Sequence, residues 1–385
     1  MGRRASLAFA VVALSVPPPA PPRQGAVGTS DAATVALCER TSTGACAAIR
    51  CSGVVIAPRV VLTARHCVTE RKTSLSCAAD VEGPLRAAPT AFAVSTSDAV
   101  ASATSWTRVV GIDVPRAQAP CGGHDVALLT LEAPLDGVAV APRFDVSAAS
   151  YDVVGFGATG SDGAGAGTRR SVIGSRLECL GGRDSCAALA DGSLEPGEFL
   201  LDARACGGDS GGGAFVGRDV AGILSRSLGA GACGRGVFGA LGAHALLIAR
   251  TVRRATPAGE VGPDWVSAAE TRGNGPGRGL GAPCDSDDDC DGRLCRSPDA
   301  GRHFSCAAPC GGGCACRPSD VGDVCFEPAP TTSCALARPT ETGSELFAVA
   351  LVTVALAWRR RQREERIPLT MYQLAMPVLE PGTRK

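Results

Sequence analysis

The sequence has few aromatic side chains and no excess of either charge. Only 4% of the 385 residues are aromatic, whereas 49 are glycine and 26 are proline. This composition disfavours long helices and predicts short strands joined by many turns. Lysine and arginine together number 38, as do aspartate and glutamate, so the formal net charge is zero. A chain without a basic surplus is not expected to bind nucleic acid.

Long apolar runs are also lacking, and the two runs near the chain ends are short. SLAFAVVALSV follows the basic MGRR and precedes a proline cluster, which is typical of a secretory signal peptide, so residues 1–25 are assigned to a signal peptide or propeptide. The apolar run at residues 346–358 spans about 20 Å as a helix, against about 30 Å of bilayer core. Arginines follow it directly. We therefore expect residues 346–362 to form a membrane anchor or a processed sorting signal, with residues 363–385 as a tail.

Cysteine, in contrast, is abundant, with 19 residues in the chain. This number indicates an oxidising compartment and an exported protein. Nine of the cysteines lie in residues 284–334, where few large apolar side chains are present, so this segment is predicted to be a small module held together by disulfides. Zinc binding by CGGGCAC and Ca²⁺ binding by DSDDD are the alternatives. Export favours disulfides over zinc binding. DSDDD lacks the spacing of an EF-hand loop and is expected to be a solvated turn. No metal or cofactor is therefore expected.

The part of the chain between these segments has the pattern of a β-protein. In residues 26–256 short apolar runs alternate with turns, which predicts an antiparallel sandwich or barrel. Residues 242–255 have helical spacing and arginines in the last turn, so we expect a closing helix there. Residues 257–283 are rich in glycine, proline and charge with little periodicity, which predicts a linker.

A set of polar residues in the β-rich segment matches the needs of nucleophilic catalysis. Ser210 lies in the glycine-rich ACGGDSGGGAF, and a serine nucleophile needs a base and a carboxylate that orients the base. His66, one of only four histidines, follows a predicted strand, and its neighbour Cys67 has a natural disulfide partner in Cys51. Asp125 opens the apolar run DVALLTL, a position suited to a buried carboxylate. Taken alone, each of these residues more often has a structural role. Their order in the chain, His, Asp, Ser, differs from the order Asp, His, Ser of subtilisin-like enzymes and from the order Ser, Asp, His of α/β-hydrolases.

The stretches LTARHC, HDVALLTL and CGGDSGGG, in this order, resemble the trypsin/chymotrypsin-like serine endopeptidases. The resemblance implies an all-β fold of two antiparallel six-stranded β-barrels with a short C-terminal helix, here followed by the disulfide-rich module and the apolar helix. It implies hydrolysis of peptide bonds in protein or peptide substrates through an acyl-enzyme, without a cofactor. Ser210 would be the nucleophile, His66 the general base and Asp125 the residue that orients His66.

The resemblance also implies roles for residues near this triad. The N–H groups of Gly208 and Ser210 would form the oxyanion hole, and Asp209 would pair with a new α-amino group at Ala26. The substrate pocket would be formed by Arg204, Ser225, Ser227 and Gly236, and Ser225 also matches the residue that bonds the triad carboxylate. Arg204 stands where trypsin-like enzymes carry aspartate, so Lys and Arg substrates are disfavoured. An inward guanidinium favours an acidic substrate side chain, and an outward one leaves a small apolar pocket.

Disulfide pairing follows partly from the same resemblance. Cys206–Cys233 matches a family disulfide beside the pocket. Cys38–Cys46 and Cys179–Cys186 are plausible local pairs, which leaves Cys77–Cys121.

The C-terminal layout resembles that of surface proteins of myxobacteria, with a Cys-containing spacer, a short apolar helix and an arginine cluster. We therefore expect a secreted or surface-anchored endopeptidase of the bacterial envelope that reaches the membrane through its C-terminal helix. The alternative is a catalytically silent, protease-like binding or adhesion protein whose Cys-rich module is the adhesive part.

Overall fold

The computed structural model describes residues 29–46, 48–70, 77, 80–183, 186, 194–229, 233–274, 284–285, 287, 290, 294–299, 301–309, 314–319 and 324–328. The chain divides into two units, residues 1–329 and 330–385, and all described residues belong to the first. The predicted signal peptide (1–25), apolar helix (346–362) and tail (363–385) lie outside the described residues. No helix in the described part of the chain is long and apolar enough to cross a membrane.

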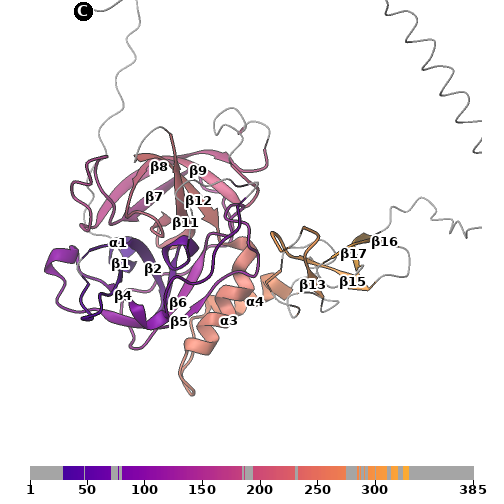
Figure 1. Cartoon of the computed structure of the whole chain (residues 1–385), viewed down its shortest axis with the longest axis horizontal. Helices are drawn as coiled ribbons and strands as arrows, with labels where there is room; N and C mark the ends of the chain where they lie inside the picture. Colours follow the sequence, from indigo (N-terminus) through magenta and orange to yellow (C-terminus); the bar gives the residue numbers. More distant parts are fainter. Residues whose placement is uncertain are drawn as a thin grey trace, which may run out of the picture. The chain divides into compact units, whose positions relative to one another are not determined.

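The first of two closed antiparallel barrels has the strand order β1-β2-β3-β6-β5-β4 (Figure 1). The short helix α1 (Thr29–Ala33) precedes it. Its strands are β1 (Thr34–Glu39), β2 (Cys51–Ala57), β3 (Val60–Thr63), β4 (Phe92–Ser95), β5 (Thr107–Asp113) and β6 (Ala127–Leu131). Every residue of β2 and β3 is buried, so both faces of these strands are covered. This double burial explains why their sequences are continuous small and apolar runs without polar alternation.

The second barrel has the strand order β10-β11-β12-β9-β8-β7. Its strands are β7 (Ser150–Gly155), β8 (Arg170–Leu180), β9 (Glu198–Cys206), β10 (Gly213–Val216), β11 (Asp219–Leu228) and β12 (Cys233–Ala240). Three of the scarce aromatic rings pack together in its core, with 5.4 Å between the centroids of Tyr151 and Phe199 and 5.4 Å between those of Phe199 and Phe238. The predicted pair of six-stranded antiparallel barrels is confirmed.

In the described part of the chain the two longest helices follow the second barrel. Four single-turn 3₁₀ helices are η1 (Arg65–Cys67), η2 (Pro89–Ala91), η3 (Val100–Ser102) and η4 (Gly242–His244). The expected closing helix is present as α3 (Ala245–Ala255), and its buried side Leu247, Ile248, Val252 packs with the core of the first barrel.

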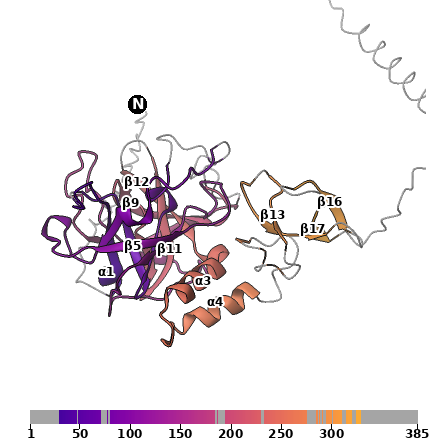
Figure 2. The same cartoon turned by 60° about the horizontal axis from the view of Figure 1, so that its bottom comes forward.

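The segment predicted as a linker, residues 257–283, differs from that expectation because it contains helix α4 (Trp265–Asn274). Figure 2 shows α3 and α4 side by side. Val266 and Ala269 are buried in the same core as α3, and the Trp265 ring lies 6.5 Å from that of Phe144. A few apolar side chains are sufficient to stabilise α4 because α3 already provides a surface for them to pack against. So few apolar residues produce little helical periodicity in the sequence.

A disulfide-rich region follows α4, as predicted. It contains β13 (Cys295–Arg296), β14 (Ser305–Cys306), β15 (Ala308–Pro309), β16 (Cys314–Arg317) and β17 (Val324–Pro328). Disulfides join Cys284 to Cys295 and Cys290 to Cys306, so these sulfurs are not thiolate ligands for zinc.

Candidate active site

The candidate base His66 lies in η1, directly after strand β3. Its neighbour Cys67 is joined to Cys51 at the start of β2, so neither sulfur offers a thiolate to a metal. The Arg50 guanidinium donates to the Cys67 carbonyl oxygen over 2.6 Å. The disulfide and this hydrogen bond therefore fix the backbone at Cys67, directly after His66.

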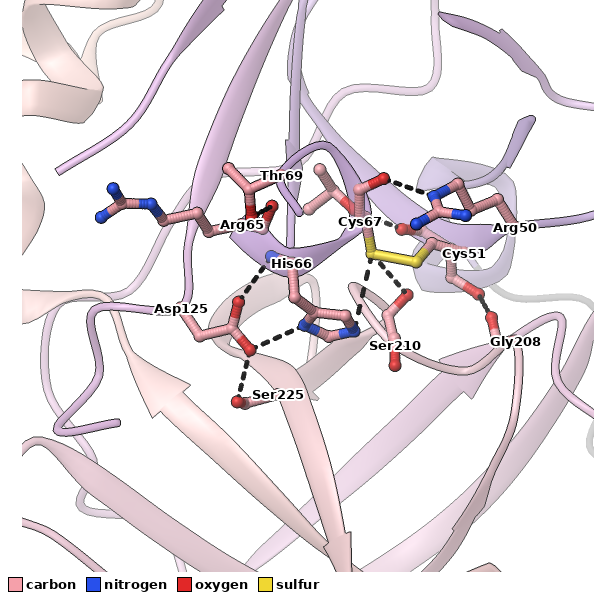
Figure 3. Close-up of a disulfide and its surroundings, with 12 residues drawn as sticks. Arg50, Cys51, Arg65, His66, Cys67, Thr69, Asp125, Gly208, Ser210 and Ser225 are labelled. Atoms are coloured by element: carbon pink, nitrogen blue, oxygen red, sulfur yellow. Dashed lines mark hydrogen bonds and ion pairs between the residues drawn. A yellow bond between two sulfur atoms is a disulfide. The ribbon is translucent and has the colours of Figure 1, made fainter. Parts of the chain in front are cut away.

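Strand pairing brings Asp125 to His66. Strands β3 and β6 pair with Thr63 opposite Ala127, so the residues that follow β3 and precede β6 meet at one end of the pair. The Asp125 side chain is 1% exposed, and its Oδ2 lies 2.8 Å from His66 Nδ1 (Figure 3). The His66 N–H donates to Oδ1 over 2.9 Å. Because a carboxylate only accepts, Nδ1 is the donor in this contact, and in a neutral imidazole Nε2 then presents a lone pair.

Ser210 lies in the loop between β9 and β10, and Figure 3 draws it beside the Nε2 edge of the His66 ring. The Ser52 N–H donates to the Ser210 carbonyl oxygen over 2.7 Å, which joins the two barrels at the serine. Within the described residues no hydrogen bond links the Ser210 hydroxyl to Nε2. Such contacts in free enzymes often tighten only when substrate binds, so the arrangement remains suitable for proton transfer.

The loop before and after Ser210 leaves two backbone donors available. The N–H groups of Asp209, Gly211 and Gly212 donate to carbonyl oxygens of the protein. Those of Gly208 and Ser210 donate to no group among the described residues. Gly208 has a φ of 98°, a backbone conformation that glycine adopts without strain. Two neighbouring free N–H groups can stabilise a negatively charged oxygen.

The Asp209 carboxylate is held inside the second barrel by backbone groups. Its Oδ1 accepts from the Gly157 N–H over 2.6 Å, and its Oδ2 accepts from the Cys206 N–H over 2.9 Å. A Cβ on Gly155 or Gly157 would overlap this carboxylate, which explains the glycines on both sides of the strand end. Burial raises the pKa of Asp209 above its ordinary value. Ala26, its proposed partner, lies outside the described residues.

Comparison with known proteins identifies the family. The family model described as trypsin matches residues 28–241, more than half of the chain. The chain belongs to the trypsin family. Among solved structures, it is similar to mouse neuropsin, described as a serine protease expressed in the limbic system of the brain. That match has 20% identity and a TM-score of 0.42, and covers 59% of this chain and 97% of neuropsin. No curated protein matches.

The residues proposed for the trypsin-family substrate pocket come from neighbouring strands. Ser227 on β11 is paired with Gly236 on β12, and Arg204 on β9 is paired with Arg235 on β12. Ser225 is different: it is buried, and its hydroxyl donates to Asp125 Oδ2 over 2.5 Å. Disulfide Cys206–Cys233 joins β9 to β12 at this end, and the remaining described pairs of the two barrels are Cys38–Cys46, Cys77–Cys121 and Cys179–Cys186.

The Arg204 side chain is exposed, whereas Ala203 and Ala205 on either side are buried. It therefore projects away from the barrel core. Arg235, the residue opposite in the register, pairs with Glu178 over 2.9 Å. A positive charge that faces solvent at this position cannot attract the Lys or Arg side chains that an aspartate attracts in trypsin-like enzymes.

No motif in the sequence pointed to Ser52, a fully buried serine in strand β2. Its hydroxyl donates to the Gly208 carbonyl oxygen over 2.8 Å and accepts from the Phe156 N–H over 2.9 Å. One hydroxyl thus holds the loop that carries the free N–H groups against the end of β7. The signal in the sequence was a serine inside the otherwise apolar CSGVVIA, which indicates a buried hydroxyl that needs partners.

A second missed feature is the buried ion pair of Glu198 and Arg226. The guanidinium donates to both carboxylate oxygens, over 2.6 and 2.7 Å. Glu198 also accepts from the N–H groups of Gly122 and Glu195, each over 3.0 Å. The pair links β9 and β11 to the loop that precedes Asp125.

Proposed function

We propose that this protein is an exported serine endopeptidase that hydrolyses peptide bonds through an acyl-enzyme. The observation that carries the proposal is the position of His66, which bonds Asp125 through Nδ1 and presents Nε2 to the side where Ser210 lies. Family membership supports the same activity. Seven disulfides in which both cysteines are described indicate an extracellular protein.

Acylation would begin at the serine hydroxyl. Ser210 Oγ attacks the substrate carbonyl carbon while His66 Nε2 takes the hydroxyl proton, and Asp125 stabilises the imidazolium that forms. The amine leaves with the proton returned by Nε2, and the acyl group stays on Oγ. Water then attacks the ester with the same base, releases the carboxylic acid and restores Ser210. Ser225 keeps the Asp125 carboxylate aligned through the bond to Oδ2.

The tetrahedral intermediates would be stabilised by the N–H groups of Gly208 and Ser210. Loss of one such donor raises the barrier by about 3 kcal/mol in comparable sites. Processing of the N-terminus would add a partner for Asp209. An α-ammonium group beside this buried carboxylate would offset the cost of burying its charge.

A fluorophosphonate probe tests the proposal directly, because it labels a serine only where a base activates the hydroxyl. The exported, N-terminally processed protein should be labelled, and the Ser210→Ala variant should not. His66→Ala should abolish labelling as well. Absence of labelling in the processed wild type would instead favour the alternative, a catalytically silent binding or adhesion protein.

We further propose that the segment 346–362 anchors the protein to the cell surface. The proposal is supported by its apolar run and the arginines that follow it. Truncation after Glu345 should release the protein into the medium, as fractionation and immunoblotting would detect. A truncated protein that stays with the membrane fraction would contradict the anchor.

A further inference from the structure

A short segment of the protease domain packs into the disulfide-rich region. Ala117 is 1% exposed and lies in one apolar cluster with Cys284, Cys290, Cys295, Phe304 and Cys306. The Arg116 guanidinium lies 4.4 Å from the centroid of the Phe304 ring. The region of residues 284–306, called the docked module below, therefore completes its small core with a side chain from the protease domain.

Backbone hydrogen bonds hold the same two segments together. The N–H groups of Gln118 and Ala119 donate to the carbonyl oxygens of Gly301 and Arg302, over 2.9 and 3.0 Å. The Arg302 guanidinium donates to the carbonyl oxygens of Asp80, over 2.8 Å, and of Cys77. Two adjacent backbone donors and one arginine side chain therefore connect the docked module to the protease domain.

A buried histidine and aspartate form a second link. His244, which precedes α3, bonds Asp285 of the docked module through Nδ1 and the Gly123 carbonyl oxygen through Nε2, both over 3.1 Å. Their side chains are 2% and 6% exposed. Burial alone would raise the pKa of Asp285, but its interactions with His244 and His124 and a backbone hydrogen bond from Arg116 together lower that pKa below its ordinary value.

Several of these contacts involve the segment just before Asp125 of the candidate triad. Gly123 lies two residues before Asp125 in the chain. Arg65, which directly precedes His66, donates to the carbonyl oxygens of Pro115 and Ala117 over 3.1 and 2.5 Å. The segment 115–123 is thus held on one side by the docked module and supports on its other side the residues next to His66 and Asp125.

We propose that the docked module is a positioning element of the catalytic site. Asp285 holds Gly123 through His244. Arg302 holds Cys77, which a disulfide joins to Cys121. Both contacts fix the segment 115–123, and this segment keeps Asp125 and His66 in register. The inference rests on the proposed endopeptidase function. Asp285 and Arg302 touch no reacting atom. Their contribution is the alignment of the carboxylate and the imidazole, which governs turnover more than substrate binding.

The test uses the full chain with Asp285→Asn and, separately, Arg302→Gln. Asp98→Asn is the matched control, because the Asp98 side chain is 81% exposed and pairs with Arg169 within the protease domain. Two quantities are measured: hydrogen exchange of the amides in residues 116–126, by mass spectrometry, and kcat and KM for peptide hydrolysis. Exchange in strand β11 serves as the folding control, because this strand lies in the second barrel.

We expect both test variants to exchange residues 116–126 at least about tenfold faster, with unchanged exchange in β11. We expect kcat to fall by about tenfold and KM to change by less than about twofold. The control should match the wild type in both measurements. Unchanged exchange, or faster exchange with an unchanged kcat, would overturn the proposal. A wild type without any hydrolysis would refute the endopeptidase function, while the exchange measurement would still decide whether the module holds the segment.

Discussion

The buried pair of Glu198 and Arg226 gives the sharpest stability prediction. The Glu198 side chain is 1% exposed and that of Arg226 is 14% exposed. Four N–H donors point at the Glu198 carboxylate: two from the guanidinium, over 2.6 and 2.7 Å, and two from the backbone of Gly122 and Glu195, over 3.0 Å. Glu198→Gln keeps the shape of the side chain and replaces one acceptor oxygen by an NH₂ group.

The expected cost follows from this donor count. The glutamine Oε1 can accept from the donors on one side only, and its NH₂ group would face a guanidinium N–H and a backbone N–H that also donate. The guanidinium also loses its counter-charge in a buried site. Removal of one partner from a buried ion pair costs about 3–5 kcal/mol. For a domain of this size each kcal/mol lowers Tm by about 2–4 °C, so Tm should fall by about 6–20 °C.

The measurement is thermal unfolding of the full chain, followed by circular dichroism. Glu178→Gln is the control because its partner Arg235 lies 2.9 Å away at the surface, with side chains 26% and 37% exposed. Loss of a pair of this kind costs less than about 1 kcal/mol. Equal Tm values for the two variants, or a fall of less than about 3 °C for Glu198→Gln, would refute the reasoning from burial and donor number.

Three further predictions concern the active site, pH and specificity. Ser52→Ala should lower kcat about tenfold at nearly constant KM, because the Gly208 carbonyl loses its donor; an unchanged kcat would contradict this. Burial and neighbouring histidines lower the pKa of His124 to about 3. In the unfolded chain the His124 imidazole therefore becomes protonated as the pH falls through about 6.5, whereas in the folded chain it stays neutral there. The unfolding free energy should therefore decrease as the pH is lowered below about 6.5. In urea titrations at several pH values, His124→Phe should reduce the slope of the unfolding free energy against pH by about 1.4 kcal/mol per pH unit. Because the Arg204 side chain is exposed, peptides with a small apolar residue before the scissile bond should be hydrolysed at least about tenfold faster than peptides with Lys or Arg, and Arg204→Ala should leave this ratio unchanged. A preference for Glu that Arg204→Ala removes would contradict the outward position of the guanidinium.

The strands could be predicted because their signals are local, whereas the pattern left a sandwich or a barrel open and the family resemblance implied two barrels. The runs CSGVVIA and VVLT are mostly apolar because β2 and β3 are buried on both faces. The motifs with His66 and Asp125 lie next to such apolar runs. Once the strands pair in register, His66 and Asp125 are brought to the same end of one strand pair.

Contacts between distant polar residues could not be predicted. The acidic DSDDD was expected to be a solvated turn, yet Asp285 is buried against His244, 41 residues earlier in the chain. Asp287 of the same stretch bonds Arg296 and the Cys295 N–H. An acidic run shows its charge in the sequence but not its partner, and a carboxylate without a partner is normally exposed. The expectation was therefore reasonable from local chemistry and wrong for the fold.

Charged side chains, rather than aromatic rings, take several buried positions near the candidate triad. Arg226, which follows Ser225, is paired with Glu198. Charged side chains also take buried positions beside the triad, at Arg65 and at His244 with Asp285. Ring packing tolerates small displacements, whereas hydrogen-bonded charges fix direction as well as distance. Loss of one partner leaves the other charge buried and uncompensated, so substitutions in these contacts should damage the site more than apolar substitutions of similar size at the same depth.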